Sequence, residues 1–187
     1  MKLNFNKKCD DMFISFLEKA TIYGEYGCGA STVYAINNFK GRIVSAETDQ
    51  KWIEKIRTQV PTKNLERTSL IWIDVGPVKE WGYPRTLEKK ENFPFYQKAI
   101  WEKESPDLVL IDGRFRVACF LQSIMNCKIG TNIIIDDYYD RPYYHCVEEV
   151  IEKKEIYGDR MALFTKDKQI DIDKASKMYE KYKFEQR

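Results

Sequence analysis

The stretch Gly24–Thr32, GEYGCGAST, decides how the fold of this chain is interpreted. The apolar run Thr21–Tyr23 precedes it and is predicted to form a short strand that leads into the glycines. Ser31–Phe39 follows it and is predicted to form a helix. The stretch is therefore interpreted as a glycine-rich turn between a first strand and the helix after it.

Four small residues of this turn are candidates for ligand binding. Gly27 and Gly29 lack the Cβ atom that would keep a ligand away from the backbone. Ser31 and Thr32 open the helix, where free N–H groups and the helix dipole favour a carboxylate or a phosphate. A tight turn without any ligand is the alternative, because a bare G-x-G pattern is weakly specific.

The rest of the chain alternates between short apolar runs and segments of helical periodicity. The runs are predicted strands at Thr21–Tyr23, Arg42–Ala46, Leu70–Ile73, Leu108–Ile111, Asn132–Ile135 and Met161–Thr165. The helices are predicted at Lys8–Ala20, Ser31–Phe39, Gln50–Thr58, Tyr96–Glu104, Arg116–Met125, Val147–Lys154 and Lys174–Lys183. Wholly apolar short strands are typical of buried parallel sheets. The prediction is a single α/β domain over residues 1–187, a doubly wound, mostly parallel sheet with helices on both faces and ligands at the carboxyl ends of the strands.

Acidic residues follow the next two predicted strands. Glu47 ends the second strand, about 20 residues after the glycines, where an acid reaches the hydroxyls of a ribose. Asp49 is a rival, placed one step into the following turn. Asp74 ends the third strand, where a carboxylate can accept from an adenine amino group. The pattern predicts an adenosine-containing ligand.

The same turn favours one adenosine ligand over another. NAD binding usually requires a third glycine for its pyrophosphate, and position 32 is Thr. Glu25, interpreted as lying in the turn, would repel a pyrophosphate and attract the ammonium group of an amino acid. S-adenosylmethionine carries that ammonium group and no phosphate.

The composition is typical of a folded protein and limits the classes of partner that are expected. The 187 residues are 43% hydrophobic and 32% charged, with a net charge of +2, so nucleic acid is not expected as the main partner. No apolar run is long enough to span a bilayer. The five cysteines form no CxxC pair and are interpreted as reduced thiols of a cytoplasmic protein.

EYGCGAST, followed by the acid of VSAE, resembles the cofactor half of the class I S-adenosylmethionine-dependent methyltransferases. The resemblance extends over roughly residues 21–165. It implies a Rossmann-like sheet with an added antiparallel strand near the C-terminus, for which Met161–Thr165 is a candidate. It also implies S-adenosylmethionine as the cofactor.

A second group of acids follows the fourth and fifth strands. Asp112 ends LVLIDG, and Asp136 and Asp137 end NIIIDD. Because these strands are expected to be neighbours, the three carboxylates should converge and need a cation to stay ionised. Mg²⁺ suits such oxygen ligands and would lower the pKa of a bound hydroxyl.

This arrangement is similar to the macrocin O-methyltransferase-like sugar O-methyltransferases, on the residues Asp112, Asp136, Asp137 and Tyr138. The resemblance implies that the three aspartates are metal ligands and that Asp112 doubles as general base. It implies transfer of a methyl group to a sugar hydroxyl of a glycan or nucleotide sugar.

Three features leave alternatives open. Arg114 and Arg116 depart from that family and would replace the metal if either paired with the carboxylates. Asp112 and Asp136 would otherwise only cap the following loops. His145 is a second candidate base.

The substrate is also open to other interpretations. The segment Gly76–Ser105 supplies aromatic side chains that either stack on a sugar ring or merely cover the sheet: Trp81, Tyr83, Phe93, Phe95 and Tyr96. A methyltransferase acting on protein, nucleic acid or a small phenol is one alternative. A catalytically inactive module that binds an adenosine ligand is another.

Overall fold

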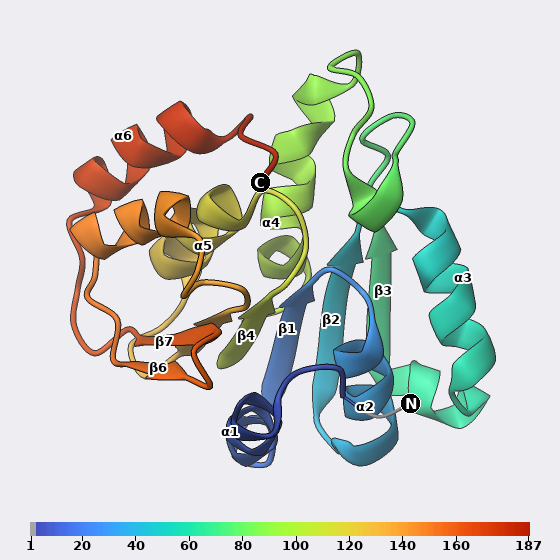
Figure 1. Ribbon diagram of the computed structural model, residues 1–187. Helices are drawn as coiled ribbons and strands as arrows, with labels where there is room; N and C mark the ends of the chain where they lie inside the picture. Colours follow the sequence, from blue (N-terminus) through green and yellow to red (C-terminus); the bar gives the residue numbers. More distant parts are fainter. Residues whose placement is uncertain (1–2) are drawn as a thin grey trace.

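Seven short strands form one sheet in the order β3-β2-β1-β4-β5-β7-β6 (Figure 1). The computed structural model describes residues 3–187. The first five strands run parallel, and β7 is antiparallel to both of its neighbours, β5 and β6. The strands are β1 (Ile22–Tyr26), β2 (Arg42–Glu47), β3 (Thr68–Trp72), β4 (Leu108–Ile111), β5 (Asn132–Ile135), β6 (Glu155–Tyr157) and β7 (Met161–Thr165). The predicted α/β class and the antiparallel strand near the C-terminus are confirmed.

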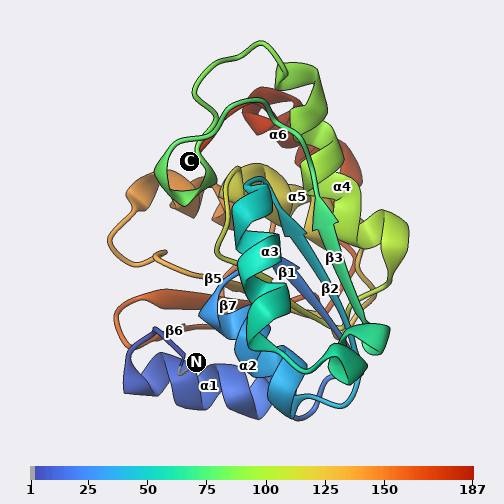
Figure 2. The ribbon, with the colours of Figure 1, turned by 90° about the vertical axis from the view of Figure 1, so that its right-hand side faces the viewer.

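Six α-helices cover the two faces of this sheet (Figures 1 and 2). They are α1 (Lys7–Leu17), α2 (Ala30–Asn38), α3 (Gln50–Gln59), α4 (Phe93–Lys103), α5 (Arg116–Asn126) and α6 (Ile172–Tyr182). Short 3₁₀ helices are η1 (Thr62–Arg67), η2 (Glu80–Gly82), η3 (Lys90–Asn92) and η4 (Pro142–Glu149). Among residues 3–187, no helix combines the length and the apolar character needed to cross a bilayer.

Two hydrophobic clusters sandwich the sheet, one on each face. Helices α1, α2 and α3 contribute to the cluster that includes Tyr23 and Leu110. Helices α4, α5 and α6 contribute to the other, which includes Tyr26 and Ile111. Successive strand residues point to opposite faces, so each fully apolar strand feeds both clusters.

Two local predictions are wrong, and the hairpin of β6 and β7 was not predicted. The first strand continues to Tyr26, so Glu25 lies in β1 and not in the turn. The segment Val147–Lys154 is not an α-helix, because η4 ends at Glu149 and β6 begins at Glu155. Gly158, at φ 58°, opens the turn that joins β6 to β7, and a Gly-Asp pair between apolar runs is a recognised hairpin signal.

The topology places the chemistry at one edge of the sheet. The chain proceeds from β1 to β3 in one direction and resumes with β4 on the other side of β1, so β1 and β4 form the switch point. Ligands bind outside the carboxyl ends of the strands at such a point. Gln186 and Arg187 lie at the same edge, where their carbonyl groups accept from the backbone N–H groups of Phe115 and Arg116.

Candidate functional site

The glycine turn after β1 lies directly against the loop after β4. A Cβ atom on Gly27 would lie 2.7 Å from the Cα atom of Gly113, and Gly27 has φ 92°. Both facts require glycine there, for close packing of two backbones and for a left-handed conformation. A Cβ on Gly29, in contrast, would meet nothing within 4 Å. Of the two predicted glycines, Gly29 therefore borders open space and Gly27 joins the turn to β4.

Glu25 supports the turn from inside the protein. Its side chain is completely buried, and its carboxylate accepts hydrogen bonds from Tyr23, Ser31, Thr32 and Ser45 at 2.5–3.0 Å. Burial raises the pKa of Glu25, and the four hydroxyl groups oppose that rise. Direct contact of this carboxylate with a cofactor ammonium has no support in this geometry.

Ser31 and Thr32 are turned toward the same carboxylate. Both side chains are buried, at 3% and 0% exposure, and Thr32 also accepts from the backbone N–H of Gly29 at 2.8 Å. Their hydroxyl groups therefore hold the start of α2 on Glu25. This leaves their backbone, and not their side chains, to face a ligand.

Glu47 lies at the last position of β2, as predicted. One of its carboxylate oxygens accepts from the backbone N–H of Cys28 in the glycine turn, at 2.7 Å. The other accepts from the backbone N–H groups of Thr48 and Asp49. Burial raises the pKa of Glu47, and these backbone bonds oppose the rise. Asp49 instead caps α3, since its side chain accepts from the backbone N–H of Lys51.

A small hairpin, residues 78–84, covers Glu47. It is closed by a bridge between Val78 and Pro84 and by a 2.8 Å bond between the backbone groups of Lys79 and Tyr83. The Thr48 hydroxyl donates to the Gly82 carbonyl at 3.0 Å, and a Cβ on Gly82 would lie 3.4 Å from the Glu47 carboxylate. Only 6% of Glu47 is exposed, so a ribose can reach it only if this hairpin shifts.

Asp74 lies just beyond the end of β3, on the outer side of the sheet. It forms an ion pair with Lys89 and accepts from the backbone N–H of Gly76 at 3.0 Å. The hydrogen bond from Lys89, followed by that from Gly76, lowers the pKa of Asp74. The segment that leads to α4 thus already engages both carboxylates that were predicted to bind adenosine.

The three aspartates after β4 and β5 do converge. Oxygen atoms of Asp112, Asp136 and Asp137 lie within 4.8 Å of one another. Neither Asp112 nor Asp137 is fully buried, with 31% and 25% of their side chains exposed, whereas Asp136 has no exposed surface.

Three arginines neutralise this cluster. Arg116 lies 3.0 Å from Asp112 and 3.4 Å from Asp137, and Arg141 lies 2.9 Å from Asp137. Arg160 donates two bonds to Asp136, at 2.6 and 2.7 Å, in the planar geometry that guanidinium and carboxylate groups share.

Burial and neighbouring charges shift the pKa values of Asp112 and Asp136 in opposite directions. Burial raises the pKa of Asp112 well above the usual aspartate range, and the neighbouring Asp136 charge adds to the rise while Arg116 opposes it. Burial by itself would raise the pKa of Asp136 as well. The hydrogen bonds from Arg160 and the charge of Arg116 outweigh it and hold the pKa of Asp136 below its usual value. Asp112 is therefore the carboxylate that most readily takes up a proton.

These residues do not fit a magnesium ion. Three carboxylates suit a divalent cation when their charge is otherwise uncompensated, but here each is paired with a guanidinium group. A Mg²⁺ ion would have to displace arginines that are themselves partly or fully buried. The sequence alternative in which arginine replaces the metal agrees with this geometry, through Arg116 and not Arg114.

Sequence reasoning missed Arg141 and Arg160. Arg141 follows Asp137 by four residues in DDYYDR, so its spacing was a usable signal. Arg160 comes from the turn between β6 and β7, and only the overlooked hairpin would have brought it to Asp136. Phe115 and Asp137, which follow β4 and β5, have φ 58° and 53°, and backbone strain of this kind gathers at functional sites.

His145 and Tyr138 lie to one side of the cluster. Their rings stack with centroids 4.5 Å apart, and the His145 ring nitrogen is 3.0 Å from the Tyr138 carbonyl. The Tyr138 hydroxyl donates to Glu148. Both residues are thus engaged in holding η4 beside the sheet.

Comparison with known proteins agrees with this architecture. A methyltransferase-like protein from Silicibacter pomeroyi is 27% identical, with a TM-score of 0.84 over 98% of this chain and 97% of that chain. An S-adenosylhomocysteine-bound methyltransferase from Podospora anserina is 15% identical, with a TM-score of 0.54 over 86% and 78%. An RNA methyltransferase from Salinibacter ruber, in complex with S-adenosyl-L-homocysteine, is 14% identical, with a TM-score of 0.51 over 90% and 97%.

No protein-family model matches the sequence, and no curated protein does. The structural neighbours include class I S-adenosylmethionine-dependent methyltransferases of differing substrate. The similarity to the Silicibacter protein extends over nearly the whole chain, including the seven-stranded, mostly parallel sheet. The chain has the Rossmann-like fold of the methyltransferases.

Proposed function

We propose that this chain is an S-adenosylmethionine-dependent O-methyltransferase that acts on a hydroxyl group of a glycan or nucleotide sugar. The observation that carries the proposal is the position of Asp112. Its backbone N–H donates to the carbonyl of Tyr26, immediately before the glycine turn, at 3.0 Å. A carboxylate that is partly exposed thus stands beside the turn where the cofactor is expected.

The residues at the turn fit this cofactor. Gly29 leaves room at the start of α2, and Glu47 supplies an acid at the end of β2 for the ribose hydroxyls once the hairpin of residues 78–84 shifts away from it. When bound, the cofactor supplies an electrophilic methyl group. Glu25, Ser31 and Thr32 hold the turn in place for it, and Asp74 remains the candidate for the adenine amino group.

Asp112 is proposed to act as general base. Its Oδ1 atom accepts a hydrogen bond from Arg116, and its carboxyl group also lies within hydrogen-bond reach of the Asp136 carboxylate. A raised pKa brings an aspartate closer to neutral pH, where a general base works best. Arg116 keeps the carboxylate in position while Asp112 takes the proton of the acceptor hydroxyl.

Exposed aromatic side chains support a sugar as the acceptor. Phe93 and Tyr96 are buried and Phe95 lies in a groove between α4 and β3, so these three cannot stack on an acceptor at this edge. Trp81 is 73% exposed on the hairpin, and Tyr139, which sequence reasoning did not single out, is 54% exposed two residues after Asp137. These two rings offer flat apolar surfaces near the carboxyl edge.

Other substrates are the second candidate. The RNA methyltransferase among the neighbours favours nucleic acid, but the net charge of +2 provides little attraction for it. Clustered acids do not by themselves exclude an inactive binding module, because the arginines here make the cluster neutral.

A screen of acceptors tests the proposal. Transfer of labelled methyl groups from S-adenosylmethionine is measured over a panel of glycans, nucleotide sugars, catechols, RNA and peptides. Turnover confined to sugar hydroxyls supports the proposal. Turnover on RNA, peptide or catechol instead would contradict it.

Chelation separates the arginine cluster from a metal site. We expect EDTA, followed by removal of the chelate, to leave methyl transfer unchanged, because Arg116, Arg141 and Arg160 already balance the three aspartates. The measurement is the rate before chelation, after it, and after addition of Mg²⁺. Loss of turnover that Mg²⁺ alone restores would show that the aspartates hold a metal.

A further inference from the structure

Two arginines in the loop between β4 and α5 have opposite surroundings. Arg116 bonds to Asp112 and to the backbone carbonyl groups of Gly113 and Asp136. Arg114 is also buried, with 7% exposure, yet its Nε atom has no hydrogen-bond partner. Within residues 3–187, the guanidinium of Arg114 forms no ion pair.

A buried N–H donor without a partner, such as the Nε–H of Arg114, costs free energy because it has lost its hydrogen bond to water and gained no acceptor. Natural proteins accept that cost mainly where a ligand completes the interaction. The Arg114 guanidinium lies over the ring of Tyr83, whose centroid is 4.2 Å away. This stacking holds the plane of the guanidinium but leaves the N–H donors along its rim free.

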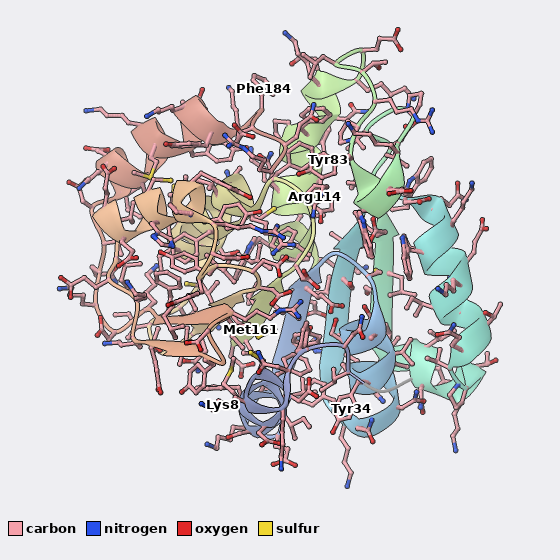
Figure 3. All side chains as sticks on the ribbon, in the orientation of Figure 1. Lys8, Tyr34, Tyr83, Arg114, Met161 and Phe184 are labelled. Carbon is pink, nitrogen blue, oxygen red and sulfur yellow. The ribbon has the colours of Figure 1, made fainter. Side chains whose placement is uncertain are left out.

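The side chain of Arg114 lies across the candidate site. Its backbone follows Gly113, which packs on Gly27 of the glycine turn. Tyr83 follows Gly82, whose carbonyl is bonded to Thr48 at the end of β2. The Arg114–Tyr83 stack therefore bridges from β4 to β2 over the turn between them, and Figure 3 shows the two side chains together above the strand ends.

We propose that Arg114 binds the oxyanion of a ligand at this edge. The ligand class is a molecule that carries a carboxylate or a phosphate, because these groups match the planar donors of guanidinium. Two sources bring such a group here: the carboxylate of the cofactor's amino-acid part, or an anionic group on the acceptor. The inference rests on the proposed function for the first source and is independent of it for the second.

Calorimetric titration of Arg114→Gln with two ligands tests the first source. The ligands are S-adenosylhomocysteine and its decarboxylated analogue. If Arg114 receives the cofactor carboxylate, the variant binds S-adenosylhomocysteine at least about 10-fold more weakly and binds the analogue as the wild type does. Arg114→Lys should recover part of the loss, and Arg57→Gln, which removes the same charge from an exposed position on α3, should cause none.

Inorganic phosphate tests the second source, with its binding followed by NMR in the presence of S-adenosylhomocysteine. If the oxyanion belongs to the acceptor, Arg114→Gln leaves cofactor affinity unchanged and abolishes the phosphate shifts seen in the wild type. Equal affinities of wild type and variant for all three probes would overturn the inference. So would an equal loss for S-adenosylhomocysteine and its analogue, because the effect would then not depend on the carboxylate. If the wild type binds phosphate through Arg114 but no S-adenosylhomocysteine, the proposed function fails and this inference stands.

Discussion

Asp112→Asn is expected to lose about 10²-fold or more of kcat on the acceptor that the screen identifies. The amide keeps the shape of the side chain and can still accept a bond from Arg116, but it cannot take a proton. Affinity for S-adenosylhomocysteine should change little, because Asp112 is not among the proposed cofactor residues, which lie on or after β1, β2 and β3. Initial rates over a range of pH and a calorimetric titration measure the two quantities.

The pH profile sharpens this prediction. A base with a raised pKa is charged only above that pKa, so the wild-type rate should fall on acidification at a pH above the usual aspartate range. The variant should lack that fall. Asp140→Asn, which removes an exposed acid from the same edge, is the matched control and should keep full activity. A fully active Asp112→Asn would remove Asp112 as base and make His145 the next residue to test.

Arg160→Gln is expected to lower the free energy of unfolding by about 3–5 kcal/mol at neutral pH. The reason is the Asp136 carboxylate, which has no exposed surface and would lose its two-bond partner. Urea unfolding at pH 7 measures the loss. Lys154→Gln, which breaks an exposed pair with Asp167, should cost less than about 1 kcal/mol.

Two further measurements test whether the unpaired Asp136 carboxylate causes this loss of stability: unfolding at acidic pH and unfolding of a double variant. The pKa of Asp136 is lowered in the folded state, so its contribution is present at neutral pH and is lost as pH falls through that lowered pKa. The gap between wild type and Arg160→Gln should therefore shrink in acid. The double variant Asp136→Asn/Arg160→Gln should recover much of the stability, because no buried charge remains unpaired. A double variant as unstable as the single one would show that Arg160 acts through packing alone.

The parts of the fold that follow from local pattern were predictable. Strands such as Leu108–Ile111 and Asn132–Ile135 are unbroken apolar runs, and the structure begins and ends both at the expected residues. Glu47 and the aspartates after β4 and β5 were found because a parallel sheet gathers the residues that end its strands. The convergence of Asp112 and Asp136 could therefore be predicted from the expected strand order alone.

Side-chain direction was not predictable in the same way. Whether Glu25 faced a ligand or the interior depended on where β1 ended, and strand alternation turns a side chain over with each residue. The cation that pairs with Asp136 comes from the turn between β6 and β7, where Arg160 lies 24 residues further along the chain. Arg116 follows its partner Asp112 by four residues, a spacing that favours pairing, whereas only the packed loop shows that Arg114 forms no ion pair within residues 3–187.

Calorimetric titration of S-adenosylhomocysteine and of NAD tests the central claim most directly. We predict that the wild type binds S-adenosylhomocysteine with a Kd of about 1–100 μM and NAD much more weakly. Glu47→Ala should weaken that binding by about 1–3 kcal/mol, the cost of a lost charged hydrogen bond. Asp49→Ala, which removes only the cap of α3, should leave it unchanged. NAD binding equal to or tighter than that of S-adenosylhomocysteine, or an Asp49→Ala loss larger than that of Glu47→Ala, would contradict a methyltransferase cofactor site at the end of β1 and β2.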